Sequence, residues 1–122
     1  MKKVLLAWML LSSFAIIGCT TTTTETNLDT FAQCLTNAWV KMYGTNTCPY
    51  CMKQKAMFWD SFSKVDYVNC QENPTECTIQ NIEWIPAWIF ADGSKLQWLQ
   101  ELQTLADKTN CKLPGDNIWT GS

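Results

Sequence analysis

Residues 39–62 have the sequence WVKMYGTNTCPYCMKQKAMFWDSF, and this stretch decides the fold. Its first five residues are mostly apolar, which predicts a buried strand over residues 39–43. Pro49 follows Cys48 directly, and proline suits the first position of a helix because the amide that it lacks would have no partner there. Apolar residues then recur at helical spacing and predict a helix over residues 49–62, with one face formed by Met52, Ala56, Trp59 and Phe62.

The Cys-Pro-Tyr-Cys motif at residues 48–51 therefore places two thiols at the start of a helix that follows a strand. Cys48 occupies the predicted N-cap, where free amides and the positive end of the helix dipole stabilise a thiolate. Cys51 lies one turn later on the same face, so it can form a disulfide with Cys48. A strand, a tight turn and a Cys-x-x-Cys helix in this order are typical of thioredoxin-like redox proteins.

A Cys-x-x-Cys motif can also belong to a metal site or form a local structural disulfide. A zinc or iron–sulfur site would need a second close pair of cysteines, or histidines. The chain has no histidine, and its remaining cysteines form no second motif of this kind. A disulfide across two intervening residues closes too short a loop to stabilise a fold by much. The pattern therefore favours redox chemistry without a metal or cofactor.

The first 18 residues have the pattern of a signal peptide. Lys2 and Lys3 precede an apolar stretch over residues 4–17, which is shorter than the roughly 20 residues of a membrane-spanning helix. Ile16-Ile17-Gly18-Cys19 resembles the lipobox of bacterial lipoproteins, which implies that Cys19 is lipidated and becomes the mature N-terminus. An uncleaved membrane anchor is the alternative, and both place the domain outside the cytoplasm, where disulfides persist. By the same resemblance, threonine after Cys19 in place of aspartate favours the periplasmic side of the outer membrane in a Gram-negative cell envelope.

Residues 19–27 are rich in threonine and predict a polar tether with nothing to bury. Loss of residues 1–18 removes two of the nine basic residues and leaves seven lysines, no arginine and eleven carboxylates. The mature protein is therefore mildly acidic and has no basic patch to hold phosphates, which argues against nucleic acid as a partner. Glycine-rich phosphate loops and the Gly-x-Ser-x-Gly and His-Glu-x-x-His hydrolase motifs are also absent.

The rest of the chain predicts one small domain over residues 28–113 and a tail over residues 114–122. From the first strand onward the elements follow the β-α-β-α-β-β-α order of the minimal thioredoxin fold. This is an α/β fold with a central four-stranded mixed sheet flanked by helices. Outside residues 39–62, the sequence predicts helices over residues 28–37, 77–81 and 99–108. It predicts strands over residues 65–69, 87–90 and 95–98, and an Asp92-Gly93 hairpin turn joins the second and third of these strands.

The segment over residues 30–111 resembles the thioredoxin-like domain attached to bacterial vitamin K epoxide reductase homologues. The resemblance rests on Phe31-Ala32-Gln33-Cys34-Leu35, Met42-Tyr43-Gly44, Cys48-Pro49-x-Cys51 and Pro86-x-Trp88. It implies a domain that passes disulfides between a membrane quinone reductase and secreted proteins. This sequence lacks the four membrane helices of that family, so its partner would be a separate membrane redox protein, either a quinone-linked oxidase or an electron-donating reductase.

The resemblance to the thioredoxin fold also implies a role for Pro86. The bond between Ile85 and Pro86 is expected to be cis and to lie opposite the Cys-x-x-Cys motif, where it exposes the backbone of Ile85 to a client peptide. An ordinary trans proline at a strand start is the alternative. Trp84 is a candidate for the same client groove, although core packing is slightly favoured for it. The predicted client-binding residues are Pro49, Tyr50, Trp84, Ile85 and Pro86.

Four cysteines remain once the lipidation site and the redox motif are assigned, and four cysteines allow three pairings. Cys70 ends a predicted strand and Cys77 lies in the next helix, so we expect these two to form a local disulfide. Cys34 precedes the first strand and Cys111 follows the last helix, and we expect them to form the second. Both disulfides are predicted to stabilise a small domain. The alternative is a second redox pair that relays electrons from the active site.

The predicted function is that of an extracytoplasmic protein thiol–disulfide oxidoreductase that acts on cysteine-containing envelope proteins. Thioredoxins have a buried aspartate six residues before the first active cysteine. This chain has Met42 there, so Cys51 must lose its proton to water or to another group. Three alternatives stay open: a glutaredoxin-like reductase, which the Pro-Tyr dipeptide matches; a lipoprotein that binds Cu(I) through Cys48 and Cys51; and a non-catalytic envelope binding module.

Four of the seven tryptophans fall at positions where the patterns of the predicted elements point into the core. We therefore expect a core built around Trp39, Trp59, Trp88 and Trp98.

Overall fold

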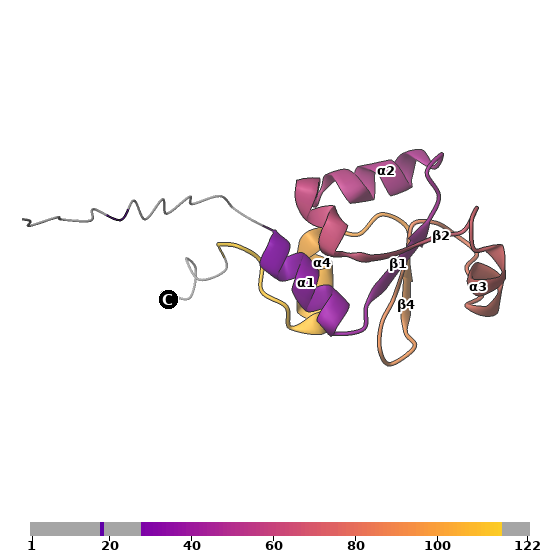
Figure 1. The fold of residues 1–122 in the computed structure, drawn as a ribbon. Helices are drawn as coiled ribbons and strands as arrows, with labels where there is room; N and C mark the ends of the chain where they lie inside the picture. Colours follow the sequence, from indigo (N-terminus) through magenta and orange to yellow (C-terminus); the bar gives the residue numbers. More distant parts are fainter. Residues whose placement is uncertain (1–17, 19–27, 116–122) are drawn as a thin grey trace, which may run out of the picture.

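The computed structural model describes Gly18 and residues 28–115 (Figure 1). The predicted signal peptide apart from Gly18, the lipidation site Cys19, the tether and most of the tail lie outside the described residues. Within residues 28–115, no helix has the length and apolar character needed to cross a membrane.

A mixed sheet of four strands in the order β2-β1-β3-β4 forms the centre of the domain. β1 pairs in parallel with β2 and antiparallel with β3, and β3 pairs antiparallel with β4. The predicted α/β fold with a four-stranded mixed sheet is therefore confirmed, and the arrangement is consistent with a minimal thioredoxin-like fold. In chain order the elements are α1 (Asp29–Asn37), β1 (Lys41–Gly44), α2 (Pro49–Ala56), the 3₁₀ helix η1 (Trp59–Lys64), β2 (Asp66–Asn69), α3 (Pro74–Ile79), β3 (Ala87–Ile89), β4 (Lys95–Gln97) and α4 (Leu102–Thr109).

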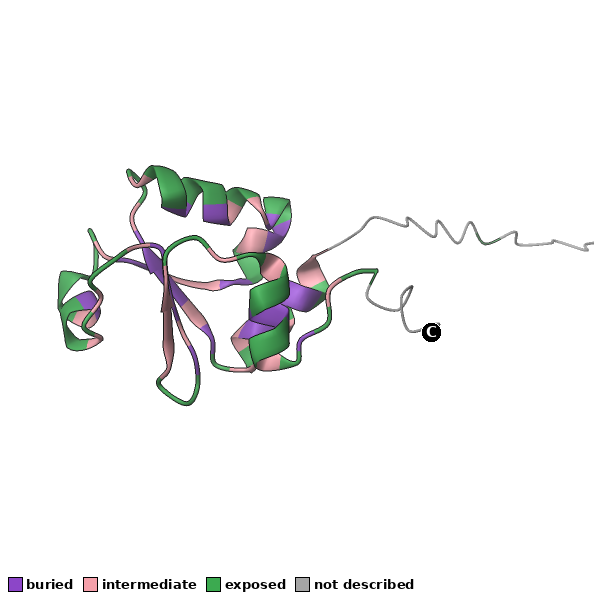
Figure 2. Cartoon of the chain, turned by 180° about the vertical axis from the view of Figure 1, so that it is seen from behind, coloured by how far each residue is buried: buried purple, intermediate pink, exposed green. Residues whose placement is uncertain are grey.

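Each face of the sheet has its own hydrophobic cluster, because side chains alternate between the two faces along a strand. Met42 and Trp88 point to the face covered by α1, α2 and α4. Tyr43 and Ala87, one residue away on the same strands, belong to the smaller cluster on the α3 face. Figure 2 shows the buried residues on the strands and on the inward sides of the helices, with exposed residues on the outer sides. The larger cluster is thus the main core, and α2, which begins directly after Cys48 and carries Cys51, packs on it.

The predicted helix over residues 49–62 is wrong in its second half. α2 ends at Ala56, and the chain continues as η1. Phe58, in the break, is fully buried and packs with ring-centroid distances of 6.0 Å to Phe31 and 5.9 Å to Trp88. Insertion of this ring into the core interrupts the helix, and Trp59 then takes a φ of 52°. Met52, which was predicted on the buried face, is exposed, because α2 turns Cys51 and Gln54 inward instead.

Three of the four tryptophans expected in the core are on the surface. Trp88 is fully buried, but Trp39, Trp59 and Trp98 are 79%, 82% and 48% exposed. All three have a positive φ, of 62°, 52° and 80°. A left-handed residue ends the periodic pattern of the element before it, so the spacing that pointed these side chains inward does not apply to them.

The other elements begin and end within a few residues of the predicted positions. α3 begins at Pro74, because proline fits the first helical position, and it ends at Ile79 rather than at residue 81. α4 begins at Leu102 rather than at residue 99. It ends at Thr109, and the C-cap residue Asn110 takes a left-handed conformation. The predicted Asp-Gly turn between β3 and β4 is present, with Gly93 at a φ of 80°.

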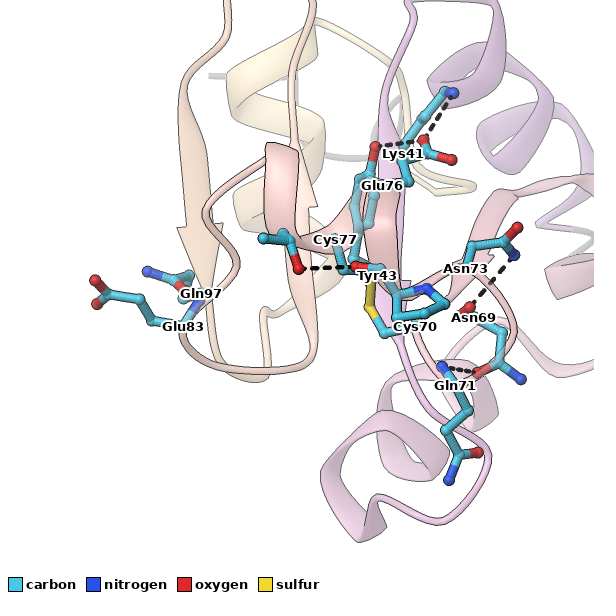
Figure 3. The surroundings of a disulfide bond; sticks show 12 residues. Lys41, Tyr43, Asn69, Cys70, Gln71, Asn73, Glu76, Cys77, Glu83 and Gln97 are labelled. Carbon is cyan, nitrogen blue, oxygen red and sulfur yellow. Dashed lines mark hydrogen bonds and ion pairs between the residues drawn. A yellow bond between two sulfur atoms is a disulfide. The ribbon is translucent and has the colours of Figure 1, made fainter.

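Both predicted disulfides are present. Cys34–Cys111 joins α1 to the segment after α4, and Cys70–Cys77 joins the end of β2 to α3. Figure 3 shows that Cys70–Cys77 lies beside a polar group on the α3 face of the sheet. There the Tyr43 hydroxyl donates a hydrogen bond of 3.1 Å to Glu76, which also pairs with Lys41 at 3.6 Å. The disulfide and this group together hold the short helix α3 on the sheet.

Candidate active site

Cys48 lies at the N-terminus of α2 as the N-cap residue, with Pro49 at the first helical position. Its Sγ accepts a hydrogen bond of 3.3 Å from the backbone N–H of Cys51. The side chain is partly exposed and is a free thiol. A thiolate at this position receives an amide hydrogen bond and the positive end of the helix dipole. Cys48 is therefore the sulfur that an incoming thiol or disulfide can reach.

Cys51 is also a free thiol, but it is fully buried. It faces Gly44 at the end of β1, where an added Cβ would lie only 2.8 Å from Cys51 Sγ. No side chain other than that of glycine fits there without displacing the sulfur. Gly44 therefore provides the space in which the second thiol lies beneath the first.

Burial raises the pKa of Cys51 to about 12, and its hydrogen bond with the Cys48 side chain and the negative charge of Cys48 act in the same direction. A hydrogen bond with the Thr45 backbone and the charge of Lys55 oppose this shift. Cys51 is consequently a neutral thiol at physiological pH. The two cysteines differ in exposure although only two residues separate them.

The loop before β3 lies against Cys48. The Ile85–Pro86 peptide bond is cis, as predicted. Cys48 Sγ is 3.9 Å from the carbonyl oxygen of Ile85. Pro86 is fully buried, and its carbonyl accepts a hydrogen bond of 2.8 Å from the N–H of Trp98. The structure thus places Ile85 and Pro86 beside the Cys-x-x-Cys motif.

Three exposed aromatic residues surround this loop, and we call them the aromatic cluster: Tyr50, Trp84 and Trp98. Trp84 stacks on Trp98 with a centroid distance of 5.0 Å, and Tyr50 meets Trp98 edge-on at 6.4 Å. Trp84 is 53% exposed, so the favoured prediction that it packs in the core is wrong. Large apolar groups gathered on a surface mark a place where a partner can bind. Trp98 therefore contacts both Tyr50 and Trp84, which were predicted to bind a client. The strand pattern had predicted Trp98 itself in the core.

Gln54 fixes α2 to the sheet, although no sequence pattern predicted a role for it. It is fully buried one turn after Cys51. Its Oε1 accepts hydrogen bonds from the indole N–H of Trp88 at 3.2 Å and from the N–H of Gln100 at 2.7 Å, and its Nε2 donates to the carbonyl of Gln100 at 2.9 Å. These bonds satisfy a polar side chain that would otherwise be costly to bury. They hold α2 in register with β3 and with the segment after β4.

Gln97 plays the corresponding part for the loop before β3. Its Oε1 accepts hydrogen bonds from the N–H groups of Glu83 at 3.0 Å and Trp84 at 2.8 Å. Two glutamines thus position the two halves of the site. Buried or bridging glutamines leave no periodic pattern in a sequence. The one signal available was that Gln54 lies three residues after Cys51, on the same side of the predicted helix.

The predicted residues of the domain come together at one end of the sheet: Cys48, Pro49, Tyr50, Cys51, Trp84, Ile85 and Pro86. The predicted lipidation site Cys19 lies outside the described residues. Within residues 28–115, no three histidine, cysteine, aspartate or glutamate side chains gather in a way that could hold a metal ion. A search against models of known protein families found none that matches this chain.

Proposed function

We propose that this protein is an extracytoplasmic thiol–disulfide oxidoreductase that exchanges disulfides with cysteine-containing envelope proteins through Cys48 and Cys51. One observation carries the proposal: a partly exposed free thiol at a helix N-cap lies above a fully buried free thiol, next to a cis-proline loop. The exposed sulfur can form a mixed disulfide with a client, and the buried one can resolve it without being reached from solvent.

In the oxidising direction a client thiolate attacks Cys48 Sγ of the Cys48–Cys51 disulfide. A client–Cys48 bond forms, the Cys48–Cys51 bond breaks, and Cys51 takes up a proton. A second client thiolate then attacks the client sulfur of the mixed disulfide and releases Cys48, so that the client is oxidised and the protein is reduced by two electrons. The reducing direction runs the same steps backwards, with Cys48 as the attacking thiolate.

Client recognition follows from the neighbours of Cys48. The backbone of Ile85 beside Cys48 offers a hydrogen-bonding edge, and the aromatic cluster, which includes Tyr50 of the Cys-x-x-Cys motif and Trp84 next to Ile85, offers an apolar contact. An extended client segment with its cysteine at Cys48 would meet both. The resemblance to the domain of vitamin K epoxide reductase homologues supports a membrane-bound, quinone-linked oxidase, or an electron-donating reductase, as the second partner.

The test is an exchange assay with the purified protein and a reduced or disulfide-bonded client. The native protein should accelerate exchange, and Cys48→Ala should abolish the acceleration. Full activity of Cys48→Ala would overturn the proposal. The direction follows from the reduction potential of the Cys48–Cys51 couple, since a value near about −120 mV indicates an oxidant and one near about −270 mV a reductant.

The cellular location is proposed from the sequence. Lipidation of Cys19 would hold the domain at the membrane through two or more acyl chains, which give stable anchoring. Mass spectrometry of the mature N-terminus should find acylated Cys19, and Cys19→Ser should lose the modification. An unmodified Cys19 would refute the lipoprotein assignment but would leave the exchange chemistry of Cys48 and Cys51 untouched.

A further inference from the structure

Lys55 lies beside Cys51, and the exchange steps proposed for Cys48 and Cys51 give it no role. It follows Cys51 by four residues on α2, so the two side chains lie on the same side of the helix. Its Nζ is 3.8 Å from the centre of the Tyr67 ring and donates a hydrogen bond of 3.0 Å to Asn46 Oδ1. An ammonium group over an aromatic face is attracted to it. These two contacts hold the charge of Lys55 between α2 and β2.

The Tyr67 ring extends to the space that Cys51 occupies. A Cβ atom added at Gly44 would lie 2.8 Å from Cys51 Sγ and 3.6 Å from Tyr67 Cε2, so the Tyr67 ring and the Cys51 sulfur border the same small space. The Tyr67 hydroxyl oxygen is buried and has no hydrogen-bond partner among the described residues. The ring, rather than the hydroxyl, is therefore the part of Tyr67 that makes the contact with Lys55.

The resolving step needs a negative charge on a fully buried sulfur. Cys51 must lose its proton to water and attack Cys48 Sγ of the mixed disulfide. The Cys51–Cys48 bond forms, and the client sulfur leaves as a thiolate that takes up a proton from water. A buried thiolate without a partner is costly, and the fully buried Met42 provides no charge or proton acceptor. Among the described residues, none of the groups that act on Cys51 is a carboxylate; they are Cys48, the Thr45 backbone and Lys55.

We propose that Lys55, held against the Tyr67 ring, supplies the positive charge that stabilises the Cys51 thiolate in the resolving step. Its role in catalysis rests on the proposed exchange function, whereas its interaction with Cys51 does not. Lys55 acts on the reacting sulfur through the electrostatic attraction of its charge, so it is a positioning residue and not a catalytic one. In the oxidising direction the same charge stabilises Cys51 as it leaves from the disulfide.

The directions of the pKa shifts agree with this assignment. Burial lowers the pKa of Lys55, and the negative charge of Cys51 opposes that shift. Burial raises the pKa of Tyr67 to about 12, and Cys51, Glu72 and Cys48 act in the same direction, so the ring remains neutral beside the ammonium group.

The direct test is the closure of the Cys48–Cys51 disulfide near neutral pH, where Lys55 carries its charge. In full-length protein with Cys19→Ser, Cys48 is first linked to thionitrobenzoate as a mixed disulfide, and attack by Cys51 releases this coloured thiolate. Lys55→Met should slow the release about tenfold, because an opposite charge nearby favours the Cys51 thiolate. Lys55→Arg should keep the rate close to that of the parent. Lys53→Met is the matched control, because Lys53 is exposed on the same helix and lies over Tyr50, and it should leave the rate unchanged.

Two tyrosine variants separate the ring from the hydroxyl. Tyr67→Phe keeps the ring and should leave the closure rate unchanged. Tyr67→Leu removes the ring nearest to Lys55, although the Phe62 ring and Asn46 still contact the ammonium group, and it should lower the closure rate by less than Lys55→Met does.

An unchanged closure rate in folded Lys55→Met protein would overturn the proposal, as would an equal decrease in Lys53→Met. A decrease in Lys55→Met together with a chain that catalyses no exchange with a client would support the charge interaction and refute the proposed function instead. Because closure from a small-molecule mixed disulfide needs no client, the two failures cannot be confused.

Discussion

The free cysteines and the disulfide-bonded cysteines occupy different parts of the fold, although burial alone does not separate them. Cys51, Cys77 and Cys111 are all buried, yet only the first is a free thiol. One disulfide joins α1 to the segment after α4 and the other joins β2 to α3, whereas Cys48 and Cys51 lie at a helix start next to the cis-proline loop. The role of each cysteine is thus set by its neighbours: a helix N-terminus and an accessible sulfur favour exchange, and two fixed elements favour a permanent link.

This comparison predicts that the two groups fail differently when they are mutated. Loss of a disulfide should lower stability and leave the exchange chemistry in place, whereas changes around Cys48 and Cys51 should alter the chemistry with a smaller effect on stability.

The largest effect on stability is expected from Cys34→Ala combined with Cys111→Ala. The disulfide has a sequence separation of 77 residues, and on the chain-entropy model a loop of this size contributes about 4–5 kcal/mol. Denaturant unfolding should record this loss. Exchange activity per folded molecule should persist, and its disappearance in folded protein would support a relay of electrons through this pair.

Cys70→Ala combined with Cys77→Ala should cost less, about 2–3 kcal/mol, because the separation is only 7 residues. The Tyr43–Glu76 hydrogen bond should still hold α3 on the sheet. Amide hydrogen exchange should therefore be faster in α3 than in the native protein and unchanged in β1. Equal losses for the two disulfides would contradict the loop-length argument.

Gly44→Ala tests the space beneath the active site. The new methyl group would lie 2.8 Å from Cys51 Sγ, and overpacking of this kind costs about 1–3 kcal/mol. Exchange should slow because the resolving thiol is displaced. Removal of the sulfur should relieve the clash, so Gly44→Ala should destabilise Cys51→Ala protein by less than it destabilises the native protein. Equal costs in both backgrounds would show that the contact is unimportant.

The smallest expected effect is an alkaline loss of stability that depends on Cys51. Burial raises its folded-state pKa to about 12 from the ordinary 9.0. The folded protein then keeps a proton that the unfolded chain has lost, so this stability is fully present below pH 9 and is lost as the pH rises towards 12. Unfolding of reduced protein between pH 8 and pH 10 should weaken more steeply than that of Cys51→Ala. Parallel pH curves would contradict the raised pKa.

Much of the site could be predicted from short patterns. The N-cap position of Cys48, the cis bond before Pro86 and both disulfide pairs follow from a motif, a position in the fold and the order of elements. Such features depend on residues that are close in sequence or on the order of elements in a known fold, and one sequence is enough to identify either.

The tryptophans and glutamines could not be predicted because they depend on turns and on tertiary contacts. Trp98 leaves the strand pattern at a positive φ and stacks on Trp84 across the loop. Gln54 is buried only because Trp88 and Gln100, distant in sequence, satisfy its polar atoms. The strand pattern predicted a core position for Trp98, which is wrong, and no pattern in the sequence pointed to the burial of Gln54.

The central claim is that Cys48 forms the mixed disulfide with a client, as the attacking sulfur in the reducing direction and as the attacked sulfur in the oxidising direction. Cys51 then resolves this mixed disulfide or is released when it forms. The most direct measurement is the amount of mixed disulfide trapped with a cysteine-containing client, compared between Cys51→Ala and Cys48→Ala after alkylation and non-reducing electrophoresis. Cys51→Ala should accumulate the covalent complex, because the exposed Cys48 still reacts and the resolving thiol is gone, and Cys48→Ala should trap almost none, because Cys51 is buried. Equal trapping by the two variants, or more by Cys48→Ala, would contradict the account.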